Sequence, residues 1–145
     1  MSTTCLVADI GGTHARLALA TLDAGGAHVR PVLGEAVTFP VEAYTGLEAV
    51  LETFLEGRAA WAPRHLSLAV ATPITGEEIR FTNSSWEFSI STLFERMSLE
   101  SLVVLNDFVA QALALPHLHA SACLPVGGPV PGLDDSQRHA RAVLG

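Results

Sequence analysis

The sequence predicts an α/β fold, with a sheet of short strands and flanking helices. Two apolar runs of strand length, residues 5–9 and 102–106, each end in a polar side chain. Between them, apolar residues recur at the spacing of one helix face, which predicts a helix that starts near residue 45. These residues are Leu47, Val50, Leu51, Phe54 and Leu55. Strands and helices that alternate along one chain are typical of α/β proteins.

The first three strands are expected to follow one another without a helix between them. Gly11 and Gly12 break the chain after the first strand, and a turn with two glycines at residues 23–26 precedes the third. The second strand is predicted at residues 16–22 and the third within residues 29–39.

The helix near residue 45 has its own start and stop signals. Thr45 is a plausible N-cap, Glu48 is its partner in a capping box, and Gly57 marks the end. Residues 125–137, rich in Pro and Gly, predict a loop. The other expected elements are strands at 66–72, 78–82 and 102–106, a helix at 91–97 capped by Ser91, and a helix at 107–115 ended by Pro116.

Composition excludes several classes of protein. The chain has 145 residues, of which 49% are hydrophobic and 16% are charged, so it has enough apolar residues for a core. Its net charge is −7, and all eight basic residues are Arg. An acidic chain without basic clusters is a poor candidate for binding nucleic acid or an anionic membrane. Without a Lys it also cannot contain a Walker A loop.

The two cysteines and the apolar runs carry few further signals. Cys5 and Cys123 make neither a disulfide framework nor a zinc site, and Cys5 is expected to be a small buried side chain. We find no signal peptide and no apolar run of membrane-spanning length. The expectation is a soluble, cytoplasmic protein without a membrane or nucleic-acid partner.

The segment from Asp9 to Arg16 is the first candidate site. Two successive glycines let the backbone turn tightly and bring amide N–H groups close to an anion, and Thr13 adds a hydroxyl. Asp9 at the strand end can hold a hydrated Mg²⁺ beside phosphates. The alternative is an ordinary hairpin turn. A dinucleotide site is excluded, because the glycine spacing differs and a strand follows.

Asn106 and Asp107 follow a buried strand, where α/β sheets place their ligands. Asp107 is a candidate general base for an alcohol, and Asn106 a candidate ligand for neighbouring hydroxyl groups. The alternative, that Asp107 only caps the next helix, stays open.

A third region combines hydroxyl, amide and indole groups after two strands. It comprises residues 71–76 and residues 82–86, and such groups bind polyols. Turn chemistry explains Thr75 and Gly76 equally well, and we expect Trp86 to serve packing.

Together these segments resemble the bacterial glucokinase family, within the hexokinase/actin-like superfamily. The resemblance is carried by residues 9–16, by residues 73–76 with 82–83 and 86–89, and by residues 105–108. It implies a ribonuclease H-like mixed sheet with flanking helices, and ATP-dependent phosphorylation of glucose with Mg²⁺. It also implies a role for each matching residue. Asp9, Gly11, Gly12 and Thr13 match the first phosphate motif, Asp107 the catalytic base, and Asn106, Thr82 and Asn83 the sugar site.

The resemblance covers only the first part of the family's longer enzymes. His14 stands where many relatives carry Asn, and the second phosphate motif would follow the strand that starts near Arg141. The resemblance implies a small domain at residues 1–115 and the start of a large domain at 116–145, in a possible homodimer. The alternatives are a sugar-binding module, an inactive remnant, or a kinase for another hexose.

Overall fold

The computed structural model describes most of the chain, which divides into two compact units. The units are Met1–Asp107 and Phe108–Gly145. The described residues are 2–23, 31–58, 62–82, 84–118, 121 and 124. The turn predicted at residues 23–26 therefore falls almost wholly outside them, as do the loop at 125–137 and Cys123.

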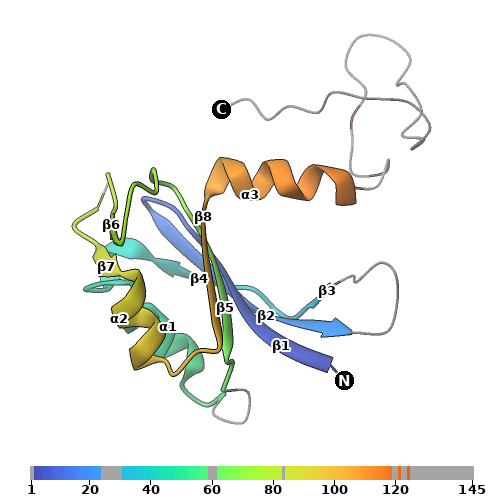
Figure 1. Ribbon diagram of the computed structural model, residues 1–145, viewed down its shortest axis with the longest axis horizontal. Helices are drawn as coiled ribbons and strands as arrows, with labels where there is room; N and C mark the ends of the chain where they lie inside the picture. The colour runs from blue at the N-terminus through green and yellow to red at the C-terminus, as the bar shows by residue number, and fades with distance from the viewer. Residues whose placement is uncertain are drawn as a thin grey trace. The chain divides into compact units, whose positions relative to one another are not determined.

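A six-stranded mixed sheet forms the centre of the first unit (Figure 1). The strand order is β3-β2-β1-β5-β8, and β4 also pairs with β2. Strands β1, β5 and β8 are parallel, whereas β2 runs antiparallel to β1, β3 and β4. The bounds are β1 Ser2–Ile10, β2 His14–Asp23, β3 Pro31–Leu33, β4 Val37–Pro40, β5 His65–Val70 and β8 Ser101–Asn106. The prediction that the first strands follow one another without a helix between them is confirmed.

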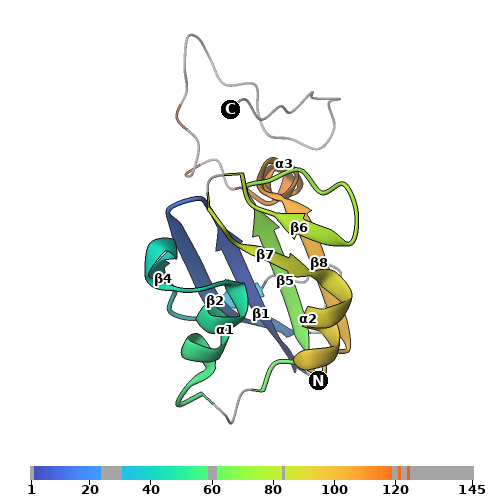
Figure 2. The same ribbon diagram turned by 90° about the vertical axis from the view of Figure 1, so that its left-hand side faces the viewer.

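Helices and a small hairpin lie on one face of this sheet (Figure 2). They are α1 (Leu47–Leu55), α2 (Ile90–Arg96) and the hairpin of β6 (Glu78–Arg80) and β7 (Glu87–Ser89), with a 3-10 turn at Val41–Ala43. Helix α3 (Asp107–Ala114) and the 3-10 turn Leu115–His117 follow β8. No helix within the described ranges is both long and apolar enough to cross a membrane.

Alternation along the strands gives the sheet two different faces. Leu6, Ala8 and Ile10 of β1 are buried and join the core beneath α1 and α2. Val7 and Asp9 project from the opposite face and are more exposed. Cys5 belongs to that second face and is only partly buried, so the expectation of a buried cysteine is not fully met. Even this partial burial raises the pKa of its thiol.

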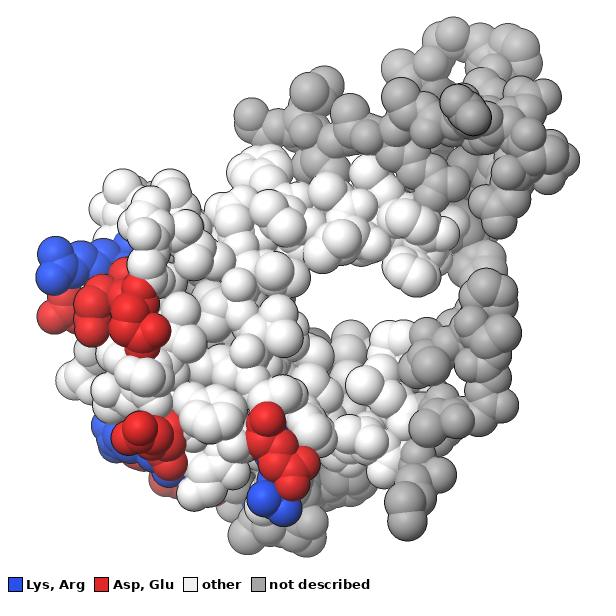
Figure 3. Space-filling view, in the orientation of Figure 1, with Lys and Arg blue, Asp and Glu red and all other residues white. Residues whose placement is uncertain are grey.

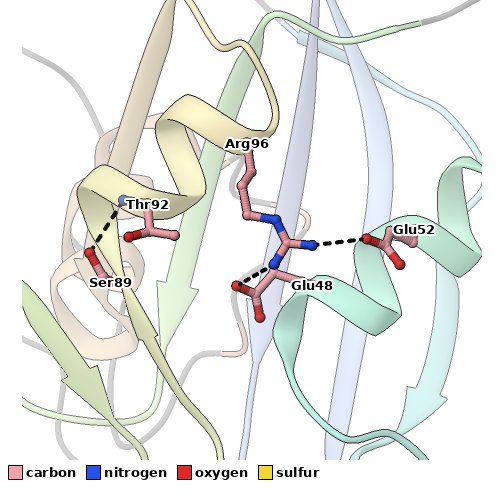
Figure 4. Close-up of polar contacts among 5 residues, drawn as sticks. All are labelled: Glu48, Glu52, Ser89, Thr92 and Arg96. Carbon is pink, nitrogen blue, oxygen red and sulfur yellow. Dashed lines mark hydrogen bonds and ion pairs between the residues drawn. The ribbon is translucent and has the colours of Figure 1, made fainter.

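The structure corrects both predicted helix caps. Gly46, not Thr45, precedes α1, and no side chain caps that helix. Glu48 does not complete a capping box; it lies 3.6 Å from Arg96 of α2, which also pairs with Glu52 at 3.5 Å (Figure 4). Arg96 and Glu52 are largely exposed and Glu48 is partly exposed, so each pair contributes less than about 1 kcal/mol.

Helix α2 starts earlier than predicted. Its N-cap is Ser89, whose Oγ accepts a hydrogen bond from the Thr92 N–H at 3.2 Å (Figure 4), and not Ser91. Ser91 instead donates its N–H to the Glu77 carboxylate, which also accepts from the Ser89 hydroxyl. The hydrogen bond from the Ser91 backbone is the main cause that holds the pKa of Glu77 below its ordinary value.

Two strand predictions also need correction. The third predicted strand is split into β3 and β4, because the pairing with β2 shifts by one residue between Leu33, which pairs with Ala20, and Val37, which pairs with Leu17. Strand β7 was not predicted. The predicted end of α1 at Gly57 is confirmed by its φ of +75°, a conformation that favours glycine.

Charged side chains of both signs lie side by side on the face shown in Figure 3. Ion pairs within the described residues include Arg64 with Glu100 at 2.8 Å and Arg80 with Glu87 at 3.4 Å.

Burial predicts different costs for the same truncation at two positions. Leu68 of β5 is fully buried, so Leu68→Ala should lower the free energy of unfolding by about 2–5 kcal/mol. Leu33 of β3 is 58% exposed, and Leu33→Ala should cost less than about 1 kcal/mol. Urea unfolding of both variants measures the difference. Equal costs would contradict the assignment of the core.

The Glu77 hydrogen bonds predict a pH-dependent contribution to stability. Because the pKa of Glu77 is lowered in the folded protein, its contribution is complete above the ordinary value of 4.5 and is lost as pH falls through the folded pKa. Glu77→Gln should therefore lower the urea midpoint at neutral pH and have little effect below the folded pKa. The adjacent Glu78→Gln is the control. An equal loss at both pH values would contradict this role.

Candidate functional site

Three parallel strands end together at one edge of the sheet. In the ladder Ile10 of β1 is level with Val70 of β5, which is level with Asn106 of β8. Adjacent strands lie about 4.8 Å apart, so the backbones of β1 and β8 are separated by roughly 10 Å at this edge. The register therefore brings the Asp9 segment and the Asn106–Asp107 pair, almost a hundred positions apart in sequence, to the same side of the molecule.

The turn between β1 and β2 is held by its own backbone. The Gly11 N–H donates to the His14 carbonyl at 2.9 Å, and the Val41 N–H donates to the Thr13 carbonyl at 2.9 Å. A Cβ at Gly11 would lie 3.4 Å from the His14 oxygen, which is close contact. Gly11 thus serves to close the turn, while Thr13 is exposed.

Asp9 projects from the sheet face opposite the core. Its side chain is 57% exposed and lies 3.6 Å from Arg16, its direct cross-strand neighbour on β2. No group of three or more His, Cys, Asp or Glu side chains that could hold a metal occurs in the described part of the chain. A single exposed carboxylate still fits Mg²⁺, which keeps several waters and takes other ligands from substrate phosphates.

Asn106 is fixed to the end of the neighbouring strand. Its Nδ2 donates to the Thr72 carbonyl at 3.2 Å and to the Val70 carbonyl at 3.5 Å. Both partners are acceptors, so the nitrogen must be the atom that faces them. These contacts hold the Nδ2 side of the amide against the end of β5.

Asp107 immediately follows β8 and lies in the first turn of α3. A carboxylate in the first turn of a helix is favoured by the helix dipole. The Asp107 side chain is partly exposed. Both interpretations from sequence, a helix-start acid and a general base, are compatible with this placement.

The segment between β6 and β7 is a closed loop. The Phe81 N–H donates to the Trp86 carbonyl at 3.1 Å, and Thr82 is exposed between them. Trp86 is 3% exposed and its Nε1 donates to the Tyr44 carbonyl at 3.1 Å. The prediction that Trp86 serves packing is confirmed. Asn83 lies outside the described residues.

A cavity of about 560 Å³ connects the two loops. Its polar lining includes Thr13 and His14 of the first turn, Glu42 and Tyr44 after β4, and Ser84 of the second loop. Sequence reasoning missed the 42–44 segment, because nothing in its residue types predicts that it would meet the turn at residues 11–13. Another cavity, of about 580 Å³, lies against α1 and α2 and is lined by none of the predicted site residues.

Comparisons with known proteins agree on one family. A family model described as Glucokinase matches residues 6–145. A glucokinase of Neisseria meningitidis is 39% identical over 126 residues, which are 87% of this chain and 36% of the relative. A glucokinase of Cupriavidus metallidurans is 35% identical over 127 residues, with the same coverage of 87% and 36%. The chain thus spans about a third of the length of these curated relatives.

Solved structures lead to the same conclusion. The crystal structure of a glucokinase from an Antarctic psychrotroph is 39% identical with a TM-score of 0.74, over 81% of this chain and 36% of that one. A glucokinase from Balamuthia mandrillaris in complex with glucose, 19% identical with a TM-score of 0.54, shares the fold over 85% of this chain and 34% of that one. The predicted ribonuclease H-like mixed sheet is confirmed, and the chain belongs to the glucokinase family.

Proposed function

We propose that this chain supplies the catalytic base and the first phosphate loop of a kinase that transfers the γ-phosphoryl group of ATP to the 6-hydroxyl of glucose. The observation that carries the proposal is the common edge at which β1 and β8 end. Membership of the glucokinase family supports the reaction class. The division into a small domain at residues 1–115 and a large one from 116 stays a prediction, as do a cytoplasmic location and a homodimer.

In the proposed reaction Asp107 accepts the proton of the sugar 6-hydroxyl. The hydroxyl oxygen forms a bond to the γ-phosphorus as the bond from phosphorus to the bridging oxygen breaks, and ADP leaves. Because the transition state is loose, positioning and charge neutralisation carry most of the catalysis. Asn106 and Thr82 hold neighbouring hydroxyl groups of the sugar, with Asn83 beside Thr82.

The first phosphate loop comprises Asp9 and residues 11–13. Gly11 shapes the turn through its hydrogen bond to His14, and the following Gly12 and Thr13 offer donors to the phosphates. Asp9 is the residue that would hold Mg²⁺, through water, and the ion would offset phosphate charge. Arg16 on the neighbouring strand lies 3.6 Å from this carboxylate.

Asp107→Asn tests the base directly. The amide keeps the shape of the side chain and cannot accept the proton, so kcat should fall by roughly 10²- to 10⁴-fold while sugar binding persists. A coupled assay for ADP measures kcat in the longest form that the native cell makes, and calorimetry measures binding. Glu95→Gln, an exposed carboxylate of α2, is the control and should leave kcat unchanged.

Two results would change the proposal. A near-normal kcat for Asp107→Asn would reject this base. Wild-type protein that phosphorylates mannose or fructose in preference to glucose would keep the mechanism and replace the substrate, whereas no turnover with any hexose would leave the inactive remnant as the better description.

A further inference from the structure

Thr72 connects the end of β8 to the β6–β7 hairpin. Its side chain is 4% exposed, and its hydroxyl donates to the Arg80 carbonyl at 2.8 Å. Its own carbonyl accepts the hydrogen bond from Asn106 Nδ2 at 3.2 Å. A buried hydroxyl costs free energy unless it is hydrogen-bonded, so this contact fixes the distance between two segments that are not neighbours in the sheet.

Both hydrogen-bond partners of Thr72 belong to the proposed sugar site or adjoin it in the sequence. Arg80 is the last residue of β6, and the loop with Thr82 starts immediately after it. On its other side the loop is held by Trp86, which donates to the Tyr44 carbonyl. Asn106 precedes Asp107 in the chain. Pro73 restricts the backbone of Thr72 to extended conformations, which limits the freedom of this connection.

We infer that Thr72 is a positioning residue that holds the sugar loop and Asn106 in one fixed arrangement. The inference rests on the proposed function and goes beyond it, because Thr72 is assigned to neither the sugar site nor the phosphate loop. Without the Thr72 hydroxyl, the Arg80 carbonyl loses its hydrogen bond to the segment that follows β5. The loop with Thr82 and the Asn106 side chain are then no longer held in the arrangement that binds the sugar. The interactions that are lost hold the substrate and the transition state equally. Their loss should therefore raise KM without lowering kcat.

Thr72→Val and Thr72→Ser form a matched pair of variants. Val keeps the volume and removes the donor, whereas Ser keeps the donor. The variants are made in the longest form of the protein that the native cell produces. Thr72→Val should raise the glucose KM by about 3- to 10-fold, which corresponds to the loss of one hydrogen bond. The KM for ATP and kcat should stay within twofold of wild type, and Thr72→Ser should restore the glucose KM. An unchanged glucose KM in Thr72→Val, with only the amount of active protein reduced, would overturn the inference.

A second measurement does not depend on catalysis. Amide hydrogen exchange should become at least tenfold faster at Phe81 in Thr72→Val, because its N–H closes the loop to Trp86. Exchange in β1 and β5 should not change, and Thr72→Ser should resemble wild type. Unchanged exchange at Phe81 would overturn the positioning role. Wild-type protein without hexose turnover would instead reject the proposed function and leave this measurement valid.

Discussion

In-register parallel pairing of β1, β5 and β8 is the constraint on which the rest of the structure depends. The ladder fixes Ile10, Val70 and Asn106 at one level, so every segment that leaves these strands starts from the same edge. A shift of one residue would move Leu6 and Leu68 from the core to the other face of the sheet. Burial of the core face therefore fixes the strand register, and the register fixes the positions of the site residues.

Hydrogen bonds beyond the ladder extend this order past the strand ends. The Ala71 N–H donates to the Ile10 carbonyl at 3.0 Å, and the Asn106 amide donates to the Thr72 carbonyl. The Thr72 hydroxyl then reaches the β6–β7 hairpin. Each connection satisfies a backbone carbonyl near the edge, so the candidate site is built on the same bonds that stabilise the sheet.

Sequence predicted those features that depend on neighbours in the chain. An apolar run followed by a polar residue placed Asp9 and Asn106 at strand ends, and the Gly11–Gly12 pair placed the turn. The caps were wrong, because no side chain caps α1 and Ser89 lies in a three-residue strand too short to recognise. The partners of Asn106 and Trp86 are carbonyl groups of distant segments, which residue types along the chain do not indicate.

The chain matches about a third of each relative, so the proposed phosphoryl transfer is the claim to test first. A crystal structure of the longest native form with glucose and a non-hydrolysable ATP analogue does so most directly. We expect the sugar 6-hydroxyl to lie at Asp107 and the phosphates to lie against Gly12 and Thr13. Glucose in the cavity beside α1 and α2, with Asp107 away from any ligand, would contradict it.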